Sequence, residues 1–107
     1  MKEFNEQSTV EFVGLHDAAD GIEKSSVTSI AQTYLGKIQK ITKHPTRLVV
    51  HVKMHEVEGK RKKYSIHSKL FVQGTFLEAS HVEWDLLSAV QRSLAALEKE
   101  VIKKFKR

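Results

Sequence analysis

The chain has 107 residues, a formal net charge of +5 and a pI of about 9.5. This length fits one domain with a hydrophobic core of its own. The absence of cysteine excludes disulfides and thiolate metal sites. No stretch is apolar over the roughly 20 residues that a membrane-spanning helix needs, and the first residues lack the apolar run of a signal peptide. We therefore expect a single cytoplasmic domain whose charge serves either a polyanion partner or solubility.

The N-terminal part of the chain predicts a tail, a short strand and a loop. Residues 1–9 are polar, and we expect them to form a flexible tail in front of a single domain over residues 10–107. Residues 10–13 predict a strand that ends at Gly14. The following segment, residues 16–21, is predicted to be a loop.

A long amphipathic helix is predicted over about residues 22–43. Asp20 and Glu23 have the spacing of a capping box at its start, and Ser25 or Ser26 could cap the helix instead. Pro45 ends the helix, because the residue before a proline is forced into extended geometry. Apolar residues recur along it at steps of three and four, as a core-facing stripe requires: Val27, Ile30, Ala31, Tyr34, Leu35, Ile38 and Ile41.

Two alternating stretches predict half-buried strands joined by a polar turn around Gly59. In the first, residues 46–57, the inward positions are Leu48, Val50, Val52 and Met54. In the second, residues 63–72, the inward positions are Tyr64, Ile66, Leu70 and Val72. Each strand therefore has one apolar face for a core and one polar face.

The Gln-Gly pair that ends at Gly74 predicts a tight turn, because glycine accepts a positive φ. A two-residue turn there sets Phe71 opposite Phe76 and Lys69 opposite Glu78 on a fourth strand. This register brings apolar residues together and pairs a cation with an anion, which favours it over alternatives.

The fourth strand is expected to span about residues 75–79, because Ser80 and Glu83 have capping-box spacing for a helix over about residues 82–105. The seam of that helix is Leu87, Val90, Leu94, Leu97, Val101 and Phe105. The order β-α-β-β-β-α predicts an α+β fold, a two-layer sandwich with two helices on one face of a four-stranded sheet. The pattern does not fix where the first strand joins the sheet.

The positive charge is segregated along the chain. The uncovered sheet face is expected to carry Arg47, His51, Lys53, His55, Lys63, His67 and Lys69. Cations near a helix C-terminus also complement the helix dipole, by about 0.3–1 kcal/mol each, so a polyanion site and stabilising decoration both stay open. The candidate RNA-binding residues are Lys37, Lys40, Lys43, Arg92, Lys99, Lys103, Lys104, Lys106 and Arg107 of the helices, with Lys53 and Lys69 of the sheet.

Histidines and aromatic residues allow other hypotheses. His51 and His55 lie about 13 Å apart along a strand, too far for one metal ion. A hairpin centred on Gly59 sets His51 opposite His67, but a third and fourth ligand are missing, so no metal or cofactor is expected.

The Phe71–Phe76 pair could stack on bases or contact a protein, and packing against the N-terminal tail is favoured. No catalytic motif occurs, so we do not expect an enzyme.

Two runs of the sequence resemble the short ribosome hibernation-promoting factors, a family that includes the ribosome-associated inhibitor A proteins. The runs are TRLVVHVKMHEVEGKRKKYSIHSKLFVQGTFLEAS and WDLLSAVQRSLAALEKEVIKKFKR, preceded by VEFVG, which resembles the family's first strand. The resemblance covers roughly residues 10–16 and 35–107. Tyr34 and Ala96 stand where the family often has lysine.

The resemblance implies that the domain binds rRNA in the decoding region of the small ribosomal subunit and blocks mRNA and tRNA under stress. It implies that the main rRNA contacts come from Lys37, Lys40, Lys99, Lys103 and Lys104. We expect a monomer with no membrane and no small-molecule substrate. Two alternatives stay open: a general structured-RNA-binding domain that acts away from the ribosome, and a protein-interaction module that uses the Phe71–Phe76 face.

Overall fold

The computed structural model of the chain describes residues 8–106. Its elements are, in chain order, β1 (Thr9–Val13), α1 (Leu15–Ala18), α2 (Gly21–Thr42), β2 (Arg47–Val57), the short 3-10 helix η2 (Glu58–Lys60), β3 (Arg61–Val72), β4 (Thr75–Glu83) and α3 (Leu86–Phe105). None of the helices within residues 8–106 combines the length and apolar character that crossing a membrane requires.

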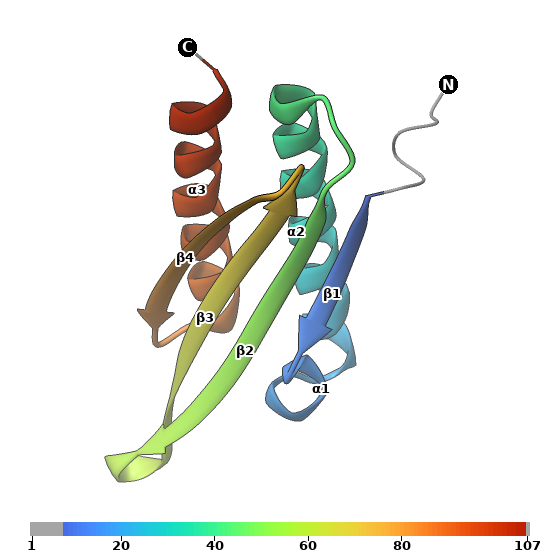
Figure 1. The fold of residues 1–107 in the computed structure, drawn as a ribbon. Helices are drawn as coiled ribbons and strands as arrows, with labels where there is room; N and C mark the ends of the chain where they lie inside the picture. The colour runs from blue at the N-terminus through green and yellow to red at the C-terminus, as the bar shows by residue number, and fades with distance from the viewer. Residues whose placement is uncertain (1–7, 107) are drawn as a thin grey trace.

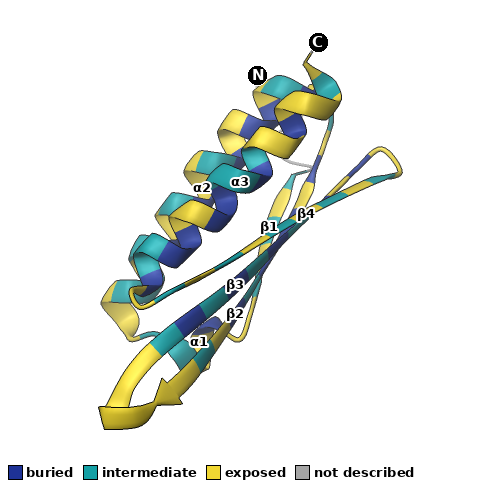
Figure 2. Ribbon diagram, turned by 90° about the vertical axis from the view of Figure 1, so that its left-hand side faces the viewer, coloured by how far each residue is buried: buried dark blue, intermediate teal, exposed yellow. Residues whose placement is uncertain are grey.

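The four strands form one sheet in the order β1-β2-β3-β4. β1 pairs with β2 in parallel, and the other pairs are antiparallel. α2 is the crossover between the two parallel strands, and α2 and α3 lie side by side on the same face of the sheet (Figures 1 and 2). The predicted α+β sandwich is thus confirmed, and β1 takes the sheet edge that the sequence pattern left undetermined.

The core lies between the helices and one face of the sheet (Figure 2). The inward positions predicted for β3 are all buried, and Ser68 joins them at 0% exposure. Met54 of β2 is only half-buried, because β2 and β3 extend beyond the helices as a projecting hairpin. The fully buried side chains that fill the interior are Ile38, Leu48, Ile66, Leu70, Leu86, Leu94, Leu97, Val27, Val50, Val72, Val90 and Val101.

Both hairpin turns set the strand register as predicted. Gln73 and Gly74 have φ values of 47° and 73°, so both adopt the left-handed conformation of a two-residue hairpin turn. This turn pairs Phe71 with Phe76. At the other end of β3, the turn at Gly59 sets the register in which His51 pairs with His67. Strand pairing therefore aligns the outward side chains of β2, β3 and β4.

Two predictions about element boundaries are wrong. The segment predicted as a loop, residues 16–21, contains most of the one-turn helix α1. Ser80 and Glu83 do not cap the last helix, because β4 continues to Glu83 and Ser80 pairs with His67. Pairing with the long strand β3 thus prevails over the local capping signal.

The two long helices begin at aspartate caps. The carboxylate of Asp85 accepts a hydrogen bond of 2.9 Å from the backbone N–H of Ser88 at the start of α3. The capping box at the start of α2 is confirmed: Asp20 accepts from the N–H of Glu23 at 2.7 Å, and Glu23 accepts from the N–H of Asp20 at 3.2 Å. These bonds satisfy N–H groups that have no partner within the helix.

Gly14 joins β1 to α1 with a φ of 86°. A Cβ atom at this position would collide with the carbonyl oxygen of Val52. We expect Gly14→Ala to lower the free energy of unfolding by about 3 kcal/mol or more, because backbone strain adds to a steric clash. Gly59→Ala is the matched control, since it has a similar φ of 75° but open space around it, and should cost only about 1–2 kcal/mol. Equal losses for the two variants in urea denaturation would contradict the proposed clash.

Candidate nucleic-acid interface

The predicted cations divide between two surfaces on opposite sides of the sheet. We define the helix surface as the exposed sides of α2 and α3 and the sheet face as the side of the sheet that no helix covers (Figure 2). Lys53 and Lys69 lie on the sheet face, where they line a common hollow. The other candidates within residues 8–106 belong to α2, α3 or their C-caps. Arg107 lies outside the described residues.

The C-terminal ends of α2 and α3 point in the same direction and lie close together (Figure 1). A hollow of about 670 Å³ at these ends brings Lys40, Lys43, His44 and Lys106 together with Phe105. Lys43 caps α2 in the left-handed conformation, and Lys106 caps α3. Candidates that are more than 60 residues apart in the sequence therefore border one concave, basic site.

A second group of cations runs along α3. Arg92, Lys99 and Lys103 are separated by seven and four residues, which places them along one stripe of the helix. All three are exposed. Helix-dipole stabilisation fades within the last turn, so it applies to Lys103 and does not account for Arg92 or Lys99.

The helix surface keeps several cations unpaired. Arg92 lies 3.5 Å from a Glu83 oxygen, and Lys103 lies 3.8 Å from Glu100. The amine of Lys37 lies 4.8 Å from the ring centroid of Tyr34. Within residues 8–106, no ion pair is formed by Lys40, Lys43, Lys99, Lys104 or Lys106. Their charges are available to an anion that approaches from solvent.

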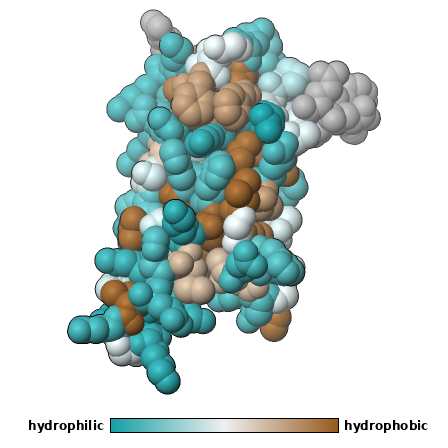
Figure 3. Space-filling model, turned by 60° about the horizontal axis from the view of Figure 1, so that its bottom comes forward, coloured by the Kyte–Doolittle hydropathy of each residue, from teal (hydrophilic) through white to brown (hydrophobic). Residues whose placement is uncertain are grey.

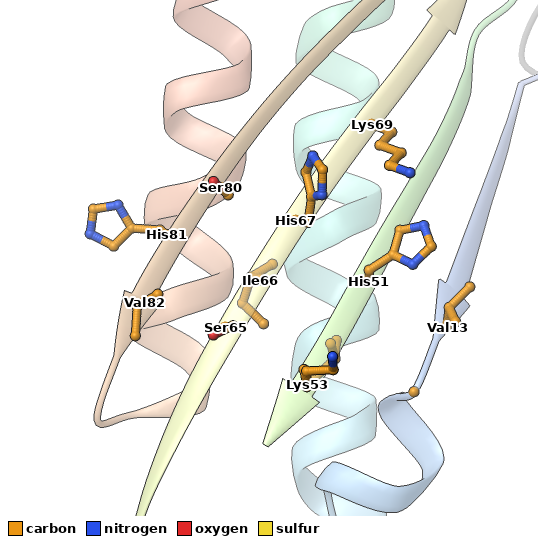
Figure 4. Close-up of a pocket in the computed structure, with 12 residues that line it drawn as sticks. Val13, His51, Lys53, Ser65, Ile66, His67, Lys69, Ser80, His81 and Val82 are labelled. Carbon is orange, nitrogen blue, oxygen red and sulfur yellow. The ribbon is translucent and has the colours of Figure 1, made fainter. Parts of the chain in front are cut away.

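The sheet face holds a second hollow, of about 580 Å³, lined by His51, Lys53, His67 and Lys69 (Figure 4). The His51 and His67 rings are 6.3 Å apart. No group of three or more potential metal ligands occurs in the described part of the chain. Hydrophilic side chains dominate the surface seen in Figure 3, with separate hydrophobic patches between them.

The carboxylates on the sheet face are paired with basic side chains. Glu11 receives hydrogen bonds of 3.1 Å from Nε and Nη2 of Arg47, and these bonds lower the pKa of the Glu11 carboxyl. Glu78 lies 2.6 Å from Nε2 of His67. Lys69 pairs with Glu78 in the strand register as predicted, but the carboxylate contacts His67. The acidic groups of this face are therefore already engaged.

Aromatic side chains mark both ends of the sheet face. Phe71 and Phe76 have ring centroids 5.1 Å apart, next to the guanidinium of Arg47. The predicted packing of this pair against the N-terminal tail stays a prediction, because most of that tail lies outside the described residues.

At the other end, the indole of Trp84 lies under Arg61, 4.0 Å from the guanidinium carbon, and under the Lys63 amine at 4.8 Å. Trp84 was not among the predicted site residues. Extending the predicted β3–β4 register by a few residues would have placed it beside Lys63, because Tyr64 pairs with Glu83.

Comparison with known proteins supports the fold. No family model and no curated protein matches the sequence. The N-terminal domain of Protein Y from Thermus thermophilus aligns with a TM-score of 0.56 and 19% identity, over 89% of this chain and 93% of that chain. A ribosomal subunit interface protein from Coxiella burnetii aligns with a TM-score of 0.55 and 12% identity, over 92% and 97%. The chain therefore has the fold that its sequence resemblance implied.

The pKa of His51 is lowered, first by burial and then by the charges of Lys69 and His67. The unfolded chain therefore binds more protons than the folded protein as the pH falls below about 6.5. The stability linked to His51 is complete above that pH and is lost as the pH falls through the folded pKa. We expect unfolding free energy to fall more steeply from pH 7 to pH 5 in the unmodified protein than in His51→Gln. An NMR titration midpoint for His51 at or above 6.5 would contradict this.

Proposed function

We propose that this protein is a ribosome hibernation factor that binds rRNA of the small subunit through its helix surface. The observation that carries the proposal is the set of unpaired lysines that two adjacent helices direct to one side of the domain. Support also comes from the fold, which is shared with the Protein Y domain and with a protein described as a ribosomal subunit interface protein. The sequence resemblance to the hibernation-promoting family agrees with both.

The mode of binding follows from where the charges lie. Lysines at several separated points suit the phosphates of a folded RNA, because phosphate contacts fix position without reading bases. Lys40, Lys43 and Lys106 would hold one phosphate cluster in the hollow at the helix ends. Lys99 and Lys103 would follow the backbone along α3, and Lys37 would extend the contact on α2.

The action of the bound domain would be steric. In the decoding region it would occupy space that mRNA and the anticodon stem of tRNA need, and translation would stop without any covalent step. The protein would act in the cytoplasm, as a monomer without a cofactor, and its release would restore the ribosome. The chain thus needs a rigid shape and a basic surface rather than catalytic residues.

A co-sedimentation experiment with purified small subunits tests this function. Binding should weaken steeply between low and high salt, because each lysine–phosphate contact releases counterions. Prebound tRNA should reduce the amount of protein that sediments. Binding that does not depend on salt would contradict phosphate contacts, and equal binding to free hairpin RNA would favour a general RNA-binding domain.

Charge reversal locates the contact. We expect Lys99→Glu to weaken binding to small subunits and to reduce the slope of log affinity against log salt by about one or more. Lys60→Glu, an equal change of charge at the exposed η2 turn, is the matched control and should leave binding close to that of the unmodified protein. If both variants lose affinity equally, net charge rather than the helix surface governs binding.

A further inference from the structure

The sheet face combines two aromatic sites with a basic hollow between them. Phe76 lies on β4 and is 46% exposed, and Trp84 follows directly after β4 and is 45% exposed. Eight residues separate them, which corresponds to about 26 Å at about 3.3 Å per residue. Lys53 and Lys69 line the hollow that lies between these ends.

Each aromatic site is accompanied by a cation. The Arg47 guanidinium lies 5.4 Å from the Phe71 ring centroid, and the Arg61 guanidinium lies 4.0 Å from that of Trp84. Of the strand residues on this face, the acidic ones are Glu11 and Glu78, and each already contacts a cationic or titratable partner. Lys53 and Lys69 form no ion pair within residues 8–106. The face therefore presents exposed ring surface and uncompensated positive charge together.

We propose that the sheet face binds a single-stranded polynucleotide. Bases would stack on the Phe71–Phe76 pair and on Trp84, and the intervening phosphates would lie over Lys53 and Lys69. Alternation of aromatic platforms with a basic groove is the chemistry by which proteins hold unpaired strands, because every base has a face that can stack. At the rise of about 3.4 Å per nucleotide of a stacked strand, a span of about 26 Å corresponds to about eight nucleotides, within the usual range of about 4–16 for one small domain.

A single strand fits this face better than a duplex or a protein does. Bases in a duplex are already stacked on one another, so exposed rings on a sheet cannot reach their faces. A protein-binding patch has an apolar centre that is depleted of lysine, whereas Lys53 and Lys69 line this hollow beside the apolar side chains of Val13 and Val82. This site lies on the side of the sheet away from the helix surface, so it does not depend on the function proposed above.

The probe for this site is a ten-nucleotide RNA of alternating cytidine and adenosine, which cannot pair with itself. Trp84 is the only tryptophan, so its fluorescence reports directly on the sheet face. We expect saturable quenching by this RNA, weaker quenching by a blunt RNA duplex of equal length, and amide chemical-shift changes in β3 and β4. The matching deoxyribonucleotide distinguishes RNA from single-stranded DNA.

Two substitutions test the aromatic sites and the charge of the hollow separately. Phe76→Ser should weaken binding at least about five-fold, the loss expected for one stacked base. Lys53→Glu should reduce the salt slope by about one. Ile102→Ser removes a side chain of comparable exposure, 38%, from α3 and should leave affinity unchanged. Thermal melts of each variant establish that it is folded before binding is compared.

Three results would overturn the proposal: no quenching, chemical-shift changes confined to α2 and α3, or duplex binding as tight as single-strand binding. Self-association of the protein that Phe76→Ser abolishes would assign this face to a protein contact instead. If the protein binds no oligonucleotide but still binds small subunits in a tRNA-sensitive way, the sheet-face proposal fails and the proposed function is unaffected. Oligonucleotide binding without binding to small subunits would support the sheet-face site and contradict the proposed function.

Discussion

The alternation of side chains along β2 and β3 is the constraint on which the core and both candidate surfaces depend. A slip of one residue would turn every apolar side chain of a strand to the opposite face. The register is held at one end by Gln73 and Gly74 and at the other by Gly59, all with positive φ. These turns keep Leu70 under the helices and Lys69 on the sheet face, so the same register that builds the core also displays the charge.

A buried polar contact positions α3 on the sheet. Ser68 of β3 and Ser93 of α3 are both 0% exposed, and their hydroxyl oxygens are 2.9 Å apart. The Ser93 hydroxyl also donates to the carbonyl oxygen of Ala79 at 3.1 Å, so the pair joins β3, β4 and α3. Buried hydroxyls are tolerated when they are hydrogen-bonded, and their direction fixes how the helix sits. The stripe that contains Lys99 is therefore held at a defined rotation about the helix axis.

Local patterns predicted most of the fold, and long-range strand pairing explains what they missed. The turn at Gly74 was predictable because its chemistry is local. The end of β4 was not, because Ser80 and Glu83 carry a helix-capping pattern whose failure depends on pairing with β3. That error also hid Trp84, whose position beside Lys63 follows only once β4 extends to Glu83. One boundary error thus removed an aromatic site from the predicted surface.

Carboxylates decide which of the predicted cations are available. The sequence predicted the segregation of charge and places Glu100 three residues before Lys103 on one helix, but it could not show that Arg92 shares Glu83 with His81. Exposed pairs of this kind contribute little stability, typically about 0–1 kcal/mol, so their main effect is on the local potential. An anion that approaches α3 meets a fully uncompensated charge at Lys99 and a partly neutralised one at Arg92. A few carboxylates on a basic domain therefore neutralise some of its cations and not others, so that the remaining positive charge forms separate sites.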